Sequence, residues 1–214
     1  MQLKNSAVDV ISYEPLTNSN LISFKSMNVS LPENTGEITL GQYQELDKLY
    51  NREDLTDTEL QYRKIKAITK LEYKTISKMP LTDLNDFVRM IDEALEEDAP
   101  FNNRVTIGNT EFGFIPNFDD IKAKEFFDLD SYDITTENLH LIMAILYRPI
   151  DGKDILGNYK IAEYAGTKGW ADIMKSVPLS IVNGALAFFL TLSKDLEHHI
   201  QRYIAPQLVK DNQQ

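Results

Sequence analysis

The sequence predicts a mainly α-helical protein, with a helical bundle-like domain, a small β-hairpin and an extended N-terminal arm. Apolar residues recur at helical spacing over most of residues 38–205. Residues 103–116 instead combine β-prone residues with Gly108-Asn109, a pair suited to a tight hairpin turn. The first 37 residues are rich in Asn, Ser and Thr and have no helical periodicity. We therefore expect an arm at 1–37, a helical domain at 38–205 and a C-terminal tail at 206–214.

Composition restricts the class of protein. Of the 214 residues, 43% are hydrophobic and 26% are charged, as is usual for chains that fold into a globular core. There are 33 acidic and 22 basic residues, which gives a net charge of −11. Because nucleic-acid binding depends on clustered Lys and Arg, we expect no nucleic-acid partner. The absence of cysteine excludes disulfides and thiolate catalysis, and it is compatible with a reducing cytoplasm.

Local sequence features predict where the helices begin and end. Thr39 is a suitable N-cap for a helix over Leu40–Tyr50, and Thr56 or Asp57 for the next helix. Pro178 favours the first turn of the longest helix, which we expect to end near Ile204. Other helices are expected at about 83–97, 118–129, 137–147 and 166–176, with a stop and turn at Pro149-Ile-Asp-Gly152. In the helix at 118–129, the predicted inward-facing residues are Phe118, Ile121, Phe126 and Leu129.

The most apolar stretch, Val177 to Leu192, spans 16 residues and includes Asn183 and Gly184. About 20 predominantly apolar residues are needed to cross a bilayer. We therefore expect a buried core helix and no stable membrane span. The N-terminus has no apolar segment of signal-peptide length, so we expect a soluble protein that is not exported.

Two exposed-looking apolar segments are candidates for contacts with other proteins. Residues Leu21 to Leu31 alternate in a way that predicts a strand or docking arm, with a disordered terminus as the alternative. The hairpin at 103–116 must pack against something, because an isolated hairpin is marginal in water. The candidate interaction residues are Ile22, Phe24, Met27 and Val29 in the arm, Phe112 and Phe114 in the hairpin, and Tyr203 near the end of the last helix.

The sequence contains no recognisable motif for catalysis or for binding a metal or cofactor. His198 and His199 are adjacent, so on a helix they point about 100° apart and do not readily share one ion. His140 lies one helical turn from Glu137, but we expect His140 and His199 to be partly buried, hydrogen-bonded imidazoles and not metal ligands. No Gly-x-Ser-x-Gly and no Gly-x-Gly-x-x-Gly sequence is present. We therefore predict no catalytic, metal or cofactor site.

One pair of carboxylates keeps an enzymatic alternative open. Asp119-Asp120 follows the aromatic hairpin directly, and a glycosidase-like acid pair is conceivable there. The first turn of a helix also favours acidic residues, because of the helix dipole, which explains the pair without a function.

Two stretches resemble uncharacterised virion-associated proteins of tailed bacteriophages, including crAss-like phages. They are Gly113-Phe-Ile-Pro-Asn-Phe-Asp-Asp-Ile121 with Phe127-Asp-Leu-Asp-Ser-Tyr132, and Leu139-His-Leu-Ile-Met-Ala-Ile-Leu-Tyr-Arg-Pro-Ile150. Upstream, Glu37-Ile-Thr-Leu-Gly-Gln-Tyr-Gln-Glu-Leu46 and Ile76-Ser-Lys-Met-Pro-Leu-Thr-Asp-Leu84 are similar in style to phage tail-assembly proteins. The resemblance implies a structural or assembly role in a virion and carries over no functional residues.

Four hypotheses follow. The leading one is a non-enzymatic virion component of the neck, tail or packaged interior, made in the host cytoplasm. It would act through contacts with other virion or tail proteins, or with itself as a homo-oligomer. The alternatives are a tail-assembly chaperone absent from the mature particle, a cargo protein ejected into the host, and a small acid/base enzyme using Asp120, His140 or His199.

Overall fold

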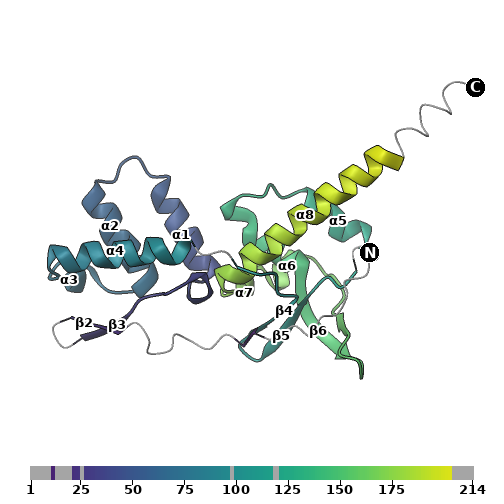
Figure 1. Ribbon diagram of the computed structural model, residues 1–214, viewed down its shortest axis with the longest axis horizontal. Helices are drawn as coiled ribbons and strands as arrows, with labels where there is room; N and C mark the ends of the chain where they lie inside the picture. Colours follow the sequence, from purple (N-terminus) through teal and green to yellow (C-terminus); the bar gives the residue numbers. More distant parts are fainter. Residues whose placement is uncertain (1–10, 13–20, 25–26, 97–98, 118–120, 204–214) are drawn as a thin grey trace, which may run out of the picture.

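The computed structural model describes residues 11–12, 21–24, 27–96, 99–117 and 121–203. Side-chain environments are described for 29–96, 99–117 and 121–191. Within these ranges the architecture is mixed α/β: helices predominate, and a four-stranded antiparallel sheet lies among them (Figure 1). The helical prediction is therefore confirmed for most of the chain, but the β structure is more extensive than a small hairpin.

Four helices follow one another in the first half of the chain. They are α1 (Leu40–Tyr50), α2 (Asp57–Thr69), α3 (Tyr73–Ile76) and α4 (Leu81–Leu95). Thr39 and Thr56 form capping boxes with Gln42 and Glu59, so two orphan backbone N–H groups at each helix start are satisfied reciprocally. Both predicted caps are confirmed.

The main sheet consists of β4 (Arg104–Ile107), β5 (Thr110–Phe114), β6 (Tyr147–Lys153) and β7 (Tyr159–Ile161), each antiparallel to its neighbour. A two-residue strand, β1 (Ile11–Ser12), adds to β4 in parallel. The predicted hairpin is confirmed as β4–β5. The predicted stop and turn at Pro149-Ile-Asp-Gly152 is wrong, because these residues lie within β6.

Pro149 is compatible with a central strand because of an irregularity beside it. Proline has no N–H to donate, so within sheets it is usually confined to edges and bulges. Here the register between β6 and β7 shifts between Ile150 and Gly152, and the Pro149 carbonyl accepts a hydrogen bond from Ala162 N at 2.8 Å. The bulge thus lets β6 continue past a residue that indicates a turn when the sequence is considered alone.

The predicted N-terminal arm contains a hairpin and not one extended strand. Strand β2 (Leu21–Phe24) pairs antiparallel with β3 (Met27–Ser30). Val29 and Leu31 are buried in the hydrophobic core of the chain itself. The last part of the 1–37 segment is therefore packed on the body, while the division into arm, domain and tail stays a prediction.

The second half of the chain contains α5 (Ala123–Asp130), α6 (Leu139–Leu146), α7 (Ala171–Met174) and α8 (Leu179–Tyr203). Short 3-10 turns occupy Thr35–Glu37, Thr136–Asn138 and Thr167–Gly169. Helix α6 leads directly into β6, so the helix predicted at 137–147 ends one residue early.

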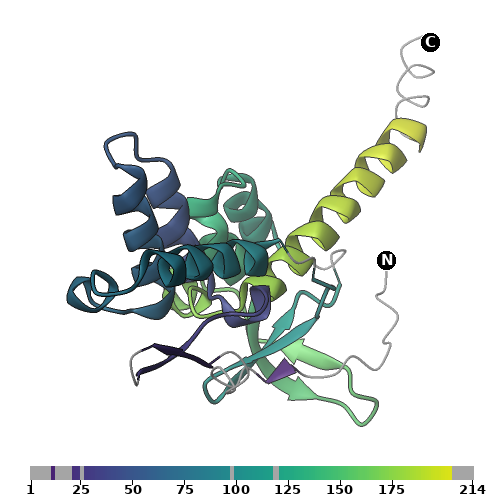
Figure 2. The same cartoon turned by 60° about the vertical axis from the view of Figure 1, so that its left-hand side comes forward.

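Helix α8 begins in the core and ends outside it. Ile181, Val182 and Ala185 are fully buried, and a Cβ at Gly184 would lie 2.5 Å from the Pro100 carbonyl oxygen. The helix thus touches the backbone that leads into the sheet. Its second half projects away from the rest of the fold (Figures 1 and 2). No helix in the described ranges combines the length and apolarity that a bilayer crossing requires.

Candidate functional site: an apolar groove between α5 and α8

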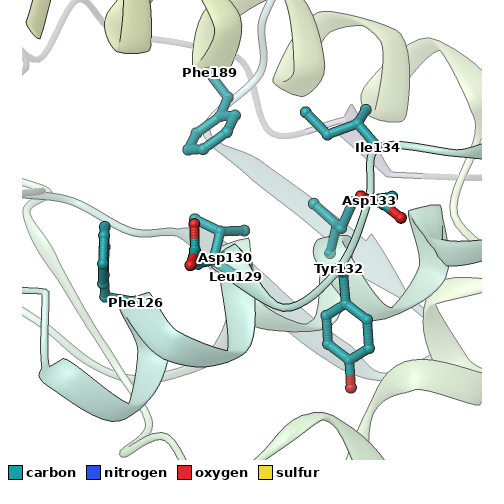
Figure 3. Close-up of a pocket in the computed structure, with 8 residues that line it drawn as sticks. Phe126, Leu129, Asp130, Tyr132, Asp133, Ile134 and Phe189 are labelled. Carbon is teal, nitrogen blue, oxygen red and sulfur yellow. The ribbon is translucent and has the colours of Figure 1, made fainter. Parts of the chain in front are cut away.

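A groove lies between α5, the loop that follows it, and α8. Its volume is about 320 Å³, and Figure 3 shows Phe189 of α8 extending into the space beside Phe126 and Leu129 of α5. The remaining lining residues are Asp130, Tyr132, Asp133, Ile134 and Ile142. Apolar side chains thus form most of the surface, and two aspartates add negative charge.

A buried ion pair fixes the α5 wall of the groove. Glu125 of α5 is 2% exposed and Arg148 of β6 is 6% exposed, and Glu125 Oε1 lies 2.6 Å from Arg148 Nη1. The other oxygen, Oε2, accepts a hydrogen bond from Lys122 N at 2.7 Å. Burying charges without a partner is costly, so this geometry strongly favours one position of the helix on the sheet.

A second anchor lies one turn further along α5. The Tyr164 hydroxyl donates a hydrogen bond to Asp128 Oδ2 at 2.7 Å. Burial, followed by this hydrogen bond to the carboxylate, raises the pKa of Tyr164 above its ordinary value. The phenol therefore remains protonated and able to donate over the whole physiological pH range.

This anchoring determines which phenylalanines of α5 face solvent. With Glu125, Asp128 and Leu129 directed toward the fold, the helical period of 3.6 residues leaves positions 126 and 127 outside. Phe126 is 53% exposed and Phe127 is 66% exposed. The prediction that Phe126 faces inward is wrong for this reason. Ile121 and Leu129 do pack against the core, whereas Phe118 lies outside the described residues.

The loop after α5 is held from the opposite side by α1. Gln44 is 8% exposed, and its Nε2 donates to the backbone carbonyls of Thr136 at 2.8 Å and Glu137 at 3.1 Å. Asn138 Nδ2 donates to the Asp133 carbonyl at 3.1 Å. These bonds order the loop and leave Ile134 51% exposed at the mouth of the groove.

The groove also has an acidic rim. Asp130 and Asp133 are exposed, and neither carboxylate forms an ion pair with the part of the chain that the structure describes. An apolar surface with unpaired negative charge at its edge suits an occupant that is itself apolar and carries positive charge beside it.

The tip of the β6–β7 hairpin exposes a second apolar feature. Ile155 and Leu156 are consecutive, with relative exposures of 102% and 78%. Asp154 orders this tip: its Oδ1 accepts from Leu156 N at 2.8 Å and from Asn158 N at 2.9 Å, and its Oδ2 accepts from Asn158 Nδ2 at 2.6 Å. The tip thus presents two aliphatic side chains on a hydrogen-bonded turn.

The structure places the predicted interaction residues differently from the sequence-based expectation. Phe112 and Phe114 have no exposed surface, and Val29 is 6% exposed. Phe112 contacts Trp170, and Phe114 contacts Phe101 and Tyr147, because alternate residues of β5 point into the core. These three residues are therefore not available to a partner. The side chains of Ile22, Phe24, Met27 and Tyr203 lie outside the described side-chain environments.

Few features of the sequence indicate the groove or the exposed tip. The helix expected at 118–129 has ordinary amphipathic spacing, and Ile155-Leu156 falls in an expected polar loop. Adjacent apolar residues beside Gly and Asp, as in Asp154-Ile-Leu-Gly157, were a usable indication of an exposed turn.

Of the candidate enzymatic residues Asp120, His140 and His199, only His140 has a described side-chain environment. His140 Nδ1 lies 3.1 Å from Gln44 Nε2, and burial, followed by the charge of Lys175, lowers the pKa of His140. Asp119-Asp120 and the His199 side chain lie outside the described environments. Within the described ranges, no three His, Asp or Glu residues are grouped so that they could hold a metal ion.

We found no match to this chain among protein-family models, curated proteins or solved structures.

Proposed function

We propose that this chain is a non-enzymatic component of a tailed-phage virion, in the neck, tail or packaged interior, that acts through protein–protein contacts. The virion assignment rests on the sequence resemblance at residues 37–46, 76–84, 113–121, 127–132 and 139–150. The contact mechanism rests on the structure, and the partners are other virion or tail proteins or further copies of this chain.

The observation that carries the contact mechanism is the groove between α5 and α8. Its walls are fixed by buried polar contacts, while Phe126 and Ile134 at its mouth are about half exposed. Exposed apolar surface in a hollow with ordered walls is typical of a site that another protein covers. Helix α8, which contributes Phe189 to the groove, continues beyond that residue and projects from the rest of the fold (Figure 2).

We also propose a division of roles between the helical body and the N-terminal arm. The helices supply a bundle-like body, and the N-terminal segment supplies an arm that reaches neighbouring subunits. Residues Ile22, Phe24, Met27 and Tyr203 are proposed to contribute to these contacts.

The test is to analyse purified particles of the phage that encodes this chain. Mass spectrometry of intact, nuclease-treated virions is expected to detect the chain at a constant copy number per particle. Its absence from particles, together with its presence in the lysate bound to tail proteins, would instead assign a tail-assembly chaperone. Absence from both would refute the proposal.

Surface labelling of the same particles separates two virion roles. A structural component of neck or tail is expected to react with a membrane-impermeant amine label before disruption. A cargo protein would react only after the particles are opened. For the labelling, free chain is the matched control, because its exposed lysines give the maximum extent of reaction.

A further inference from the structure

We propose that Gln44 and His140 form a pH-sensitive contact, which holds the loop at 131–138 against α1 at neutral pH and loosens it when His140 is protonated. Ile134 and two neighbouring residues of this loop line the α5–α8 groove, so the protonation of His140 would determine how firmly one wall of the groove is held. This contact does not depend on the proposed virion role, because both residues belong to the same chain.

The side-chain amide of Gln44 joins α1 to the loop. Its Nε2 lies 2.8 Å from the Thr136 carbonyl oxygen, 3.1 Å from the Glu137 carbonyl oxygen and 3.1 Å from His140 Nδ1. The two carbonyl oxygens only accept hydrogen bonds, so the amide nitrogen, and not the amide oxygen, belongs among these three atoms. An amide nitrogen donates two hydrogens and accepts none, so His140 Nδ1 can take part in this contact only as an acceptor.

Neutral His140 meets this requirement and protonated His140 does not. In a neutral imidazole one ring nitrogen donates and the other accepts, and the tautomer with its hydrogen on Nε2 presents the Nδ1 lone pair to Gln44. Protonation places a hydrogen on both ring nitrogens, so Nδ1–H then faces the N–H groups of the amide. Two facing donors repel each other, and one of them must move.

The protonated ring has an acceptor nearby, which is the backbone carbonyl of Glu137. A hydrogen bond between the ring and this carbonyl favours the charged imidazole and thereby raises the pKa of His140. A charged donor forms a stronger hydrogen bond than a neutral amide does. The charged ring therefore displaces Gln44 from the Glu137 carbonyl, and the amide retains only its bond to Thr136.

The surroundings of His140 set the pH at which this exchange occurs. Burial, followed by the charge of Lys175 on α7, lowers the pKa of His140, and Lys48 on α1 adds to this effect. The Glu137 carbonyl and the Asp172 carboxylate on α7 act in the opposite direction, and Asp172 also forms an ion pair with Lys175 at 2.7 Å. The net pKa is below the ordinary value of about 6.5, so the loop is held at neutral pH and loosens in mild acid.

The experiment follows hydrogen exchange of the full-length chain by mass spectrometry, from about pH 7.5 to about pH 5. Each rate is divided by the intrinsic rate of an unfolded amide at the same pH. In the loop, Thr135 N donates to the Asp133 carbonyl at 2.8 Å and Asn138 N donates to the Thr135 carbonyl at 2.9 Å, so these amides report opening. Their protection is expected to fall about threefold to tenfold in acid, as the loss of one hydrogen bond implies. Protection in α4 is expected to stay constant.

Three variants test the assignment to His140. His140→Asn places a non-titrating acceptor near the position of Nδ1, so loop protection is expected to become independent of pH. Lys175→Gln removes a neighbouring cation and is expected to move the transition to higher pH, whereas Asp172→Asn removes an anion and is expected to move it to lower pH. Lys160→Gln, an exposed change on β7, is the matched control and is expected to leave the transition in place.

The proposal is overturned if loop protection is the same across the pH range, or if His140→Asn keeps the wild-type transition. It is also overturned if Lys175→Gln and Asp172→Asn move the transition in the same direction, or if the control moves it as far as they do. Should His140→Asn fail to fold, the opposite shifts expected of the two charge variants decide the question by themselves. None of these results depends on whether the chain is found in virions.

Discussion

The Glu125–Arg148 pair provides the sharpest test of how the groove is built. The perturbation is Glu125→Gln, which keeps the shape of the side chain and its acceptor for Lys122 N but removes the negative charge. Arg148, which is 6% exposed, would then be a buried cation without its counter-charge. Breaking a buried pair by removing one partner costs about 3–5 kcal/mol.

That magnitude follows from burial and geometry. Both side chains are below 10% exposed and the N–O distance is 2.6 Å, so water cannot replace the lost partner without moving α5. By contrast, the Arg89–Glu93 pair on α4 is about 60% exposed on both sides, and surface pairs contribute about 0–1 kcal/mol. Glu93→Gln is therefore the matched control.

The assay is urea unfolding followed by circular dichroism, with linear extrapolation to zero denaturant. Glu125→Gln should lower the free energy of unfolding by about 3–5 kcal/mol, and Glu93→Gln by less than about 1 kcal/mol. Hydrogen exchange should also become faster in α5 of the first variant. If the two variants were equally stable, Arg148 would have to be solvated or paired elsewhere, and the account of the groove wall would be refuted.

Three further predictions concern single residues. In Gly113→Ala the new Cβ would lie 2.3 Å from the Tyr159 ring. We therefore expect the free energy of unfolding in urea to fall by about 1–3 kcal/mol. An unchanged free energy would show that the ring can move aside. Gly184→Ala should gain about 1 kcal/mol of helix propensity, yet the Pro100 carbonyl oxygen at 2.5 Å should make the variant less stable overall, and a raised melting temperature would contradict this contact. Burial lowers the pKa of His140 in the folded chain, so as pH falls the unfolded chain binds a proton at this residue before the folded chain does. The free energy of unfolding should therefore fall as pH drops below about 6.5, and this decrease should end below the folded-state pKa. Thermal melts of His140→Gln should lack that part of the pH dependence, and an unchanged profile would assign it to other groups.

Locally encoded features of this fold could be predicted from the sequence. The N-caps Thr39 and Thr56 depend on side chains three residues apart, and the β4–β5 turn depends on Gly108-Asn109 alone. The start of the long helix was predicted to within one residue, because its apolar spacing persists over many turns. In each case the determining interactions lie within a few residues along the chain.

Other features depended on contacts between distant parts of the sequence. Pro149 indicates a turn by itself, and only the register between β6 and β7 accommodates it within a strand. Phe112 and Phe126 have the same side chain, yet Phe112 is fully buried and Phe126 is about half exposed. Phe112 is buried because that face of β5 lies against the core. Phe126 is exposed because the ion pair of Glu125 with Arg148 turns the neighbouring face of α5 toward the sheet.

Composition and periodicity thus determined that this acidic chain would form mainly helices around an apolar core. Only the tertiary structure decided which apolar side chains complete that core and which remain outside, at the groove and at the hairpin tip. The physical reason is that burial is a property of the assembled fold. The ion pair between Glu125 and Arg148, 23 positions apart in the sequence, sets the orientation of α5 and leaves Phe126 outside, although its helical spacing predicts an inward position.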